Sequence, residues 1–348
     1  MGKKKINLTI WHVKNFDLHP PTEDVDNSTI TDYGSCPRKG FYKHGLQRGF
    51  EGKSWSIQFG LATHKYCEVV SSGLMAQGEK RELTDEIHSA AVNAAIEGWE
   101  NPPLEHKDGF LDMGRLYQTC LALKAKFIRE LAGGEIEITR AEDAFDLELP
   151  FHVCRNCSWA FFEDVEVCPN CGCEHIFQAR HGGRIDQFAK DHGRVVHLIR
   201  DWKTTKYKPY NYEDKFDPNN QFLGYTWAAD ELSGQNFDGV LIETIYNTKT
   251  QGPIITSHYA SYSEGQIEAW QASMMVERQM LHLMWSRVEE LGYLAFPMRT
   301  QECGSYGGCR YRECCRSGSA FEIEKWLKDY TIESKWDYTD PSGEESKV

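Results

Sequence analysis

The chain has 348 residues, of which 40% are hydrophobic and 12% aromatic, so it can bury a large core as one domain with insertions or as two ordinary domains. It contains no apolar run of membrane-spanning length and begins without the apolar stretch of a secretory signal, so we expect an intracellular protein. Its net charge of -13, taken alone, counts against a protein that binds nucleic acid. The charge is uneven, however, because residues 38–53 and 180–208 are basic, and a polyanion could bind there.

Apolar periodicity and turn residues predict the order of helices and strands. Residues 1–30 carry only weak strand and loop signals, and the tail after Phe321 is acidic and expected to be solvated. Asp217 is a good N-cap, with Pro218 in the first turn of the helix that follows. The predicted helices are 56–74, 84–99, 110–131, 217–232 and 263–291. The predicted strands are 135–149, 182–190, 195–205, 237–247 and 253–262.

The hairpin at residues 182–205 brings three charged side chains together. Side chains alternate along a strand, so Asp201 and Lys203 point to one face and Trp202 points to the other. Asp186 lies on the neighbouring antiparallel strand, within reach of Asp201. Two carboxylates this close need a cation between them, and carboxylates, waters and phosphate oxygens satisfy Mg²⁺. The lysine could then position a water or offset charge on a phosphate.

Two predicted helices carry further polar side chains at one-turn spacing. Gly60, His64 and Glu68 recur every four residues on one face of the helix at 56–74. A lone helical histidine is usually packed in a core or exposed at the surface. The acidic hairpin at 182–205, later in the chain, nevertheless favours a His64 that faces a metal ion, with Glu68 behind it as a second-layer residue. Gln221 and Tyr225 lie one turn apart on a later helix, and we expect them close to Trp202.

Twelve cysteines in a chain without an export signal indicate metal ligands before disulfides. Cys154-x2-Cys157 and Cys168-x2-Cys171 form two knuckles about ten residues apart, the spacing of a structural Zn²⁺ ribbon with four thiolate ligands. Cys173 is a spare thiol that could replace Cys171. Such a ribbon mainly stabilises a loop and could also touch substrate.

A second group of cysteines lies near the end of the chain, at Cys303, Cys309, Cys314 and Cys315, in a glycine-rich stretch without a second knuckle pair. Three thiolates from this stretch need a fourth ligand from elsewhere, and Cys36 is the unpaired candidate. Zinc and a [4Fe–4S] cluster both accept four thiolates.

Together these motifs resemble the RecB-like branch of the PD-(D/E)XK nuclease superfamily, the branch that includes Cas4 and the AddB nuclease domain. The resemblance covers about residues 30 to 320 and rests on four short motifs in the family order. They are Gly60-x3-His64, Gly183-x2-Asp186, Asp201-x-Lys203 and Gln221-x3-Tyr225.

The resemblance implies an α/β fold with a restriction-endonuclease-like core, in which helices flank a central mixed sheet. A zinc ribbon at 150–178 would be inserted in it, and a cysteine cluster would join both ends of the chain. We therefore expect an N-terminal extension at 1–30, a nuclease domain at 31–320 and an acidic tail at 321–348.

The resemblance also implies metal-dependent hydrolysis of phosphodiester bonds. His64, Asp186, Asp201 and the Trp202 carbonyl would hold one or two Mg²⁺ or Mn²⁺ ions, and Lys203 would orient the attacking water. Gln221 and Tyr225 would contact DNA or brace the site.

Iron–sulfur members of this branch have one cysteine before the histidine helix and three after the last strand. Cys36, Cys303, Cys309 and Cys315 would be those ligands, although Cys303-x5-Cys309 departs from the usual x2 spacing and Cys314 could replace Cys315. The zinc ribbon is not part of the common pattern.

The expected activity is that of an exonuclease on single-stranded DNA or duplex ends, in recombination, repair or phage DNA processing. Recombination or replication proteins would be its partners, and the cytoplasm of a bacterium or of a phage-infected host its location. Two alternatives stay open: a non-catalytic module that binds DNA ends or assembles with a partner, and a zinc protein without iron.

Overall fold

A computed structural model describes residues 11–21, 24–51, 55–78, 81–97, 99, 112–205, 212–248 and 250–335. Predictions that fall on other residues, including the start of the helix at 110–131, Lys206, Lys208 and the end of the acidic tail, lie outside the described residues. The chain divides into two compact units. Unit 1 comprises Met1–Glu51, Asp146–Gly183 and Gln271–Val348, and unit 2 comprises Gly52–Phe145 and Arg184–Trp270.

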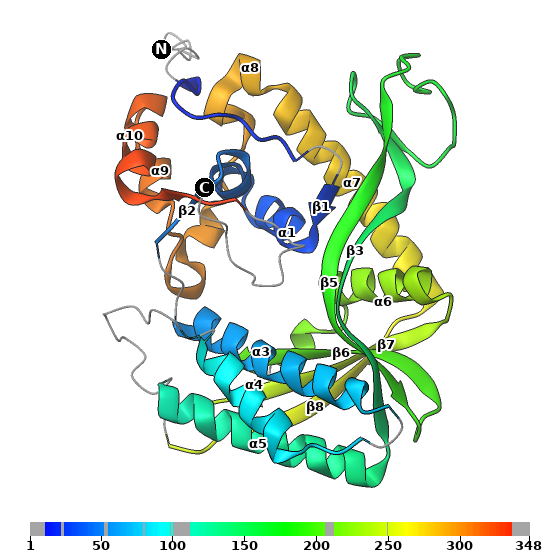
Figure 1. Ribbon diagram of the computed structural model, residues 1–348. Coiled ribbons are helices and arrows are strands. Elements are labelled where there is room, and N and C mark those ends of the chain that lie inside the picture. Colours follow the sequence, from blue (N-terminus) through cyan, green and yellow to red (C-terminus); the bar gives the residue numbers. More distant parts are fainter. Residues whose placement is uncertain are drawn as a thin grey trace. The chain divides into compact units, whose positions relative to one another are not determined.

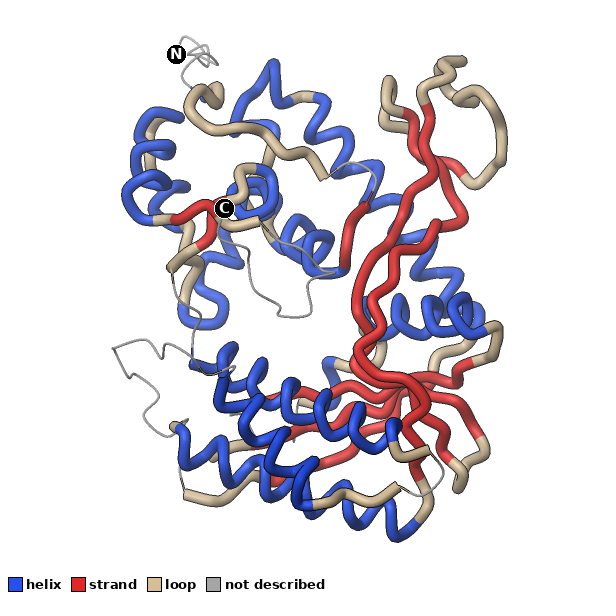
Figure 2. The backbone as a smooth tube through the Cα atoms, in the orientation of Figure 1, coloured by secondary structure: helices blue, strands red, loops and turns tan. Residues whose placement is uncertain are grey.

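A mixed sheet is the main element of the fold (Figures 1 and 2), as predicted. Its strands follow the order β4-β3-β5-β6-β7-β8, and β1 pairs with β5. β5 and β6 are antiparallel, β6 and β7 parallel, and β7 and β8 antiparallel. The strands are β1 (Asp24–Asp26), β2 (Arg48–Gly49), β3 (Ile136–Cys154), β4 (Ala160–Phe161), β5 (Ile176–Asp191), β6 (Val196–Thr205), β7 (Phe237–Tyr246), β8 (Ile254–Ser261) and β9 (Ile332–Glu333).

Helices cover both faces of the sheet in unit 2. On one face Trp202 is fully buried among apolar side chains of three helices, and Phe127 lies 5.6 Å from its ring. On the other face Lys203 lies over the ring of Phe222 in α6. The flanked mixed sheet expected from sequence is therefore confirmed. The helices are α1 (Asn27–Ser35), α2 (Pro37–Gly40), α3 (Trp55–Ala76), α4 (Asp85–Glu97), α5 (Met113–Gly133), α6 (Asn220–Ser233), α7 (Glu264–Ser286), α8 (Val288–Leu291), α9 (Arg312–Arg316) and α10 (Ala320–Tyr330).

Three predicted elements differ from the structure. The N-cap of α6 is Asn219, whose side chain accepts hydrogen bonds from the N–H groups of Gln221 and Phe222, so the prediction of Asp217 is wrong. The predicted helix at 263–291 is interrupted, because α7 ends at Ser286 and a separate turn, α8, follows. The expectation of a solvated tail is wrong for residues 321–330, which form most of α10 and bury Ile323 and Leu327.

Unit 1 has its own aromatic core. Phe41 stacks on Phe296 with ring centroids 4.2 Å apart and meets the edge of Tyr293. Gly45 lies so close to Trp285 that a Cβ there would come within 2.7 Å of the indole, so only glycine fits without a shift. Aromatic packing, which buries large apolar areas, thus links the chain before α3 to the chain after α7. None of the helices in the described ranges has the length and hydrophobicity needed to cross a bilayer.

Within unit 1, a buried histidine makes stability depend on pH. His181 on β5 is 1% exposed, and burial lowers its pKa from 6.5 to about 4, an effect that Arg278 adds to and Asp26 opposes. Between these two pH values the unfolded chain binds a proton that the folded chain does not, so stability is lost as pH falls from 6.5 towards 4. At pH 5 we expect this loss to be about 2 kcal/mol.

Urea unfolding at pH 7 and pH 5 measures the effect. The parent should lose about 2 kcal/mol more on acidification than His181→Gln does. His192→Gln, on the exposed β5–β6 turn, is the matched control and should behave as the parent does. Equal losses in the parent and His181→Gln would contradict the assignment.

Candidate functional site

The β5–β6 hairpin places Asp186 opposite Asp201. The last registered pair of the ladder is Gln187 with Arg200, so Asp186 and Asp201 are the next residues along the two antiparallel strands. The backbone N–H of Trp202 donates to Asp186 Oδ2 over 3.2 Å. Both carboxylates belong to unit 2 and, as predicted from the alternation of side chains, Trp202 points to the other face.

α3 brings an imidazole to this pair. His64 Nδ1 lies 3.1 Å from Asp186 Oδ2. One turn earlier, a Cβ on Gly60 would meet Thr204 Oγ1 of β6 at 3.2 Å, so the glycine permits the close approach of helix and strand. Glu68, one turn after His64, is held by Lys65, whose ammonium lies 2.8 and 2.9 Å from its carboxylate oxygens.

Lys203 is the cation of the site. Its Nζ lies 2.9 Å from Asp201 Oδ2 and 3.5 Å from Gln221 Oε1. Burial lowers the pKa of Lys203, but the charges of Asp201 and Asp186 outweigh that effect and the pKa is raised. The side chain therefore stays an ammonium, which can hold or polarise a water or a phosphate oxygen rather than remove a proton.

α6 extends the hydrogen bonds away from Lys203. Gln221 donates through Nε2 to the hydroxyl of Tyr225 over 2.9 Å, and the Tyr225 ring meets the edge of Phe145 with centroids 6.1 Å apart. The structure therefore brings the polar side chains of the four sequence motifs to one side of the sheet in unit 2, while Gly183 belongs to unit 1.

The electrostatics of the two carboxylates suit a bound cation. Burial raises the pKa of Asp201 to about 6, and the charge of Asp186 adds to the rise. Burial also acts to raise the pKa of Asp186, but His64 and Lys203 outweigh it and lower that pKa. Asp201 Oδ2 is buried without a well-directed hydrogen bond from the described residues. The buried carboxylate of Asp201, the half-buried carboxylate of Asp186 and an imidazole are a ligand set that Mg²⁺ or Mn²⁺ accepts.

Sequence reasoning missed Glu142 of β3. Its backbone φ is +53°, a conformation that is uncommon for a residue other than glycine, and its carboxylate lies 3.2 Å from Arg184 Nε. Burial raises its pKa to about 8, with the charges of Asp186 and Glu68 adding to the rise. Glu142 therefore belongs to the electrostatic environment of the site.

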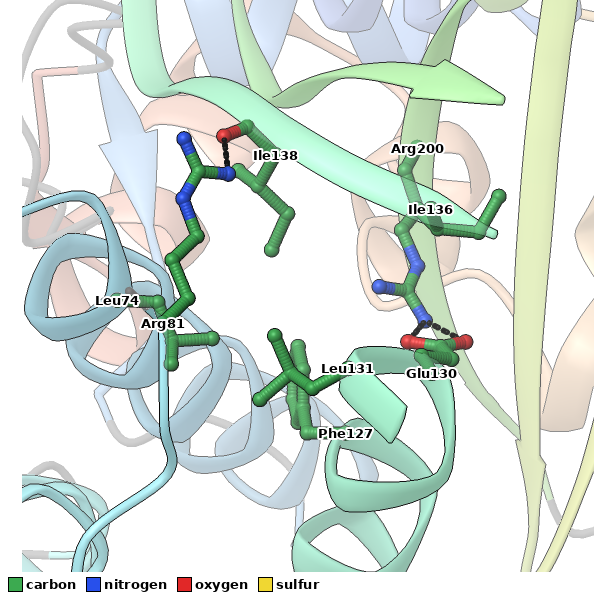
Figure 3. Close-up of a pocket in the computed structure, with 8 residues that line it drawn as sticks. All are labelled: Leu74, Arg81, Phe127, Glu130, Leu131, Ile136, Ile138 and Arg200. Carbon is green, nitrogen blue, oxygen red and sulfur yellow. Dashed lines mark hydrogen bonds and ion pairs between the residues drawn. The ribbon is translucent and has the colours of Figure 1, made fainter. Parts of the chain in front are cut away.

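The opposite face of β6 carries a buried ion-pair network. Arg200 directly precedes Asp201, is fully buried, and pairs with Glu130 at 2.8 Å and Glu243 at 3.0 Å. Its guanidinium also lies 4.4 Å from the Trp202 ring. Figure 3 shows Arg200 and Glu130 beside a cavity of about 20 Å³, which is room for a single water molecule. These ion pairs thus hold β6, the strand that carries Asp201, in place on the face opposite the carboxylate.

Four cysteines in unit 1 lie close enough together to hold one metal ion. Cys154, Cys157, Cys168 and Cys171 place their sulfurs within 4.8 Å of one another. Cys154 and Cys171 lie 3.7 Å apart, and Cys157 and Cys168 3.6 Å apart, close to the ~3.8 Å of a tetrahedral ion with 2.3 Å Zn–S bonds. No other such group of three or more ligand atoms occurs in the described part of the chain, so His64, Asp186 and Asp201 form a more open arrangement.

The structure favours Cys171 over Cys173 as the fourth thiolate. We expect Cys171→Ser to lose the metal of this site and Cys173→Ser to retain it, although Cys173 lies 3.3 Å from Cys154. The backbone N–H of Cys173 lowers the pKa of Cys171 to about 6, which favours the thiolate form that binds metal. Metal analysis of the two purified variants is the measurement, and zinc retained by Cys171→Ser would refute the assignment.

The second cysteine group is also gathered within unit 1. Burial, together with charge on Cys36, Cys309 and Cys303, raises the pKa of Cys315 to about 11, against the opposing charge of Arg38. Burial raises the pKa of Cys309 too, and charge on Cys36 and Cys303 adds to it. Cys314 is fully buried and interacts electrostatically with Cys315 and Cys309. Cys36 therefore lies near Cys309 and Cys315, although more than 260 residues of the sequence separate them.

Comparison with known proteins agrees with this geometry. A family model described as the PD-(D/E)XK nuclease superfamily matches residues 27–316. No curated protein matches the chain. The matched range includes all four motifs of the site and every cysteine of the two groups in unit 1.

Proposed function

The chain belongs to the PD-(D/E)XK nuclease superfamily, and we propose that it is a metal-dependent DNA nuclease whose active centre is the His64, Asp186, Asp201 and Lys203 group. The observation that carries the proposal is the convergence of these four side chains, with His64 3.1 Å from Asp186 and Lys203 2.9 Å from Asp201. A site without a catalytic task has no need for all four.

Each residue has a defined task in this proposal. His64, Asp186, Asp201 and the Trp202 carbonyl would hold Mg²⁺ or Mn²⁺, which supplies Lewis-acid activation of the scissile phosphate and of a water. Lys203, kept as an ammonium by its two carboxylate neighbours, orients the water and offsets charge on the phosphate. Gln221 fixes the position of Lys203, Tyr225 fixes Gln221, and Glu68 supports the helix face of His64.

We further propose that Cys36, Cys303, Cys309 and Cys315 bind a [4Fe–4S] cluster, while Cys154, Cys157, Cys168 and Cys171 bind zinc. Two observations support different ions in the two groups. The ribbon sulfurs are as close as a single tetrahedral ion needs, and among the described residues the other group is not gathered within 4.8 Å. A cluster of four irons holds its thiolates farther apart than one ion does. The charge interactions favour Cys315 over Cys314 as the ligand.

For the substrate, we propose single-stranded DNA or duplex ends, processed exonucleolytically in recombination, repair or phage DNA metabolism, with recombination or replication proteins as partners. The protein would act in the cytoplasm of a bacterium or of a phage-infected host. The division into an extension at 1–30, a nuclease domain at 31–320 with the ribbon at 150–178, and a tail at 321–348 stays a prediction.

The direct test is a cleavage assay with DNA labelled at its 5′ or 3′ end, together with metal analysis of the same preparation. We expect degradation only when Mg²⁺ or Mn²⁺ is added, and both iron and zinc in protein purified without oxygen. DNA binding without any cleavage would favour the alternative, a non-catalytic module for DNA ends. A colourless protein that contains only zinc would contradict the iron–sulfur proposal.

A further inference from the structure

The cysteine ribbon of unit 1 exposes a short run of large apolar side chains. Phe162, Val165 and Val167 lie between β4 and the second knuckle and are 48%, 39% and 44% exposed. A single exposed apolar side chain is ordinary, but a group of them marks a surface that another molecule covers. Figure 1 shows the ribbon as the loops beyond the ends of β3 and β5.

The run belongs to a loop that is held at both ends. It follows β4, in which Phe161 pairs with His152 of β3, and it ends at Cys168, which is 1% exposed. The rings of Phe162 and the buried Phe151 meet edge to face, with centroids 6.2 Å apart. Residues 162–167 are nevertheless all exposed, and we call them the acidic loop.

The carboxylates of the acidic loop are available to a partner. Glu163, Asp164 and Glu166 are interleaved with the three apolar side chains, and within the described part of the chain none of them takes part in an ion pair. The only lysine or arginine between residues 155 and 175 is Arg155, whose guanidinium lies 4.7 Å from the ring of Phe177. The ribbon therefore presents negative charge next to apolar surface.

We propose that the acidic loop is a docking surface for a segment of another protein in which lysine or arginine side chains are interleaved with apolar ones. Apolar side chains of that segment pack on the apolar side chains of the loop, and its cations pair with the three carboxylates. Six residues span at most about 20 Å, so one short segment can reach all of them. This surface gives the ribbon a task beyond stabilising its own loop.

Charge decides between this partner and two others. DNA would bring its phosphates against the carboxylates of the loop, which is unfavourable. The acidic loop of a second copy would bring carboxylates against carboxylates, which costs free energy as well. The inference does not rest on the proposed nuclease centre, because the loop belongs to unit 1 and that centre to unit 2.

The test measures binding of three dye-labelled peptides of equal length by fluorescence anisotropy. The first alternates leucine with lysine, the second leucine with glutamate, and the third serine with lysine. The parent should bind the leucine–lysine peptide at least about tenfold more tightly than either of the others, because only that peptide matches both the charge and the apolar side chains. Equal binding of the three peptides, or no binding of the first, would overturn the proposal.

Two loop variants separate the apolar contribution from the charge. Phe162→Ser combined with Val165→Ser should weaken binding of the leucine–lysine peptide by at least about tenfold. Glu163→Gln combined with Glu166→Gln should weaken it by about 3- to 30-fold at about 0.1 M salt, and its difference from the parent should shrink at about 1 M salt. Both variants should keep the metal content of the parent, since neither replaces a cysteine.

Two exposed residues of unit 1 outside the ribbon supply matched controls. Met280→Ser removes an apolar side chain of α7 that is 50% exposed, and Glu289→Gln removes an exposed carboxylate of α8. Both should bind the peptide as the parent does. Parental binding by both loop variants, or equal losses in the loop variants and the controls, would contradict a docking surface on the acidic loop.

Further measurements on the same proteins test the other occupants and the proposed function. Loss of DNA binding in the loop variants, or a parental dimer that sedimentation shows to dissociate in them, would overturn the proposal in favour of DNA or of a second copy. The loop variants should cleave DNA as the parent does. Peptide binding by a parent that never cuts would leave the docking surface and remove the nuclease, and cleavage without peptide binding would do the reverse.

Discussion

Asp201→Asn should abolish metal-dependent cleavage of single-stranded DNA while the protein remains folded. The substitution removes the charge that, with Asp186 and His64, would attract the divalent ion. Burial raises the pKa of Asp201, which means that its charged form is costly in the metal-free protein. The variant should therefore be at least as stable as the parent at pH 7, and urea unfolding should show it.

Lys203→Gln should reduce kcat by about 10²–10³-fold, the usual cost of removing one group that stabilises charge in a transition state. Asp191→Asn is the matched control, because Asp191 lies in the same hairpin, at the turn end of the ladder, and accepts a hydrogen bond from the N–H of Arg194. It should leave cleavage unchanged. Parental rates in both Asp201→Asn and Lys203→Gln would show that the active centre lies elsewhere.

Arg200→Met should have the largest effect on stability. It removes the cation between Glu243 and Glu130 and leaves a fully buried carboxylate at Glu243 with less compensation. Breaking a buried ion pair costs about 3–5 kcal/mol, and we expect the lower end because Lys126 still lies 3.1 Å from Glu243. Denaturant unfolding measures the free energy directly.

A second substitution separates the lost charge from lost packing. Arg200→Met combined with Glu243→Leu removes both buried charges and should recover most of the stability, because apolar groups often replace a buried pair without cost. Arg194→Ala, an exposed arginine of the same hairpin, should change stability by no more than about 0.5 kcal/mol. A single Arg200→Met variant as stable as the parent would show that the network contributes nothing.

Local patterns in the sequence were sufficient to predict the β5–β6 hairpin and the sides on which its residues lie. The β-branched run before Asp201 and the turn at Asp191 specify the strands and their antiparallel pairing, and alternation then assigns the faces. The same holds for the ribbon, where two C-x2-C knuckles are a local signal and the four sulfurs are found together.

Features that depend on tertiary structure could not be predicted from local sequence patterns. Glu142 is one acidic residue among several in an alternating strand, and only the folded backbone turns its carboxylate towards Arg184 and the charge of Asp186. Asp217 and Asn219 are both good N-caps, and the choice between them depends on how the preceding loop approaches α6. Cys314 and Cys315 are adjacent, so spacing alone cannot choose between them.

Mn²⁺ binding, followed by electron paramagnetic resonance, tests most directly whether Asp186 and Asp201 hold a metal ion, when the parent is compared with a variant that carries both Asp186→Asn and Asp201→Asn. We expect the parent to bind Mn²⁺ and the double variant to bind it at least about tenfold more weakly, with the zinc content of the ribbon unchanged. Equal Mn²⁺ binding by the two proteins would contradict the assignment of these carboxylates to a metal site.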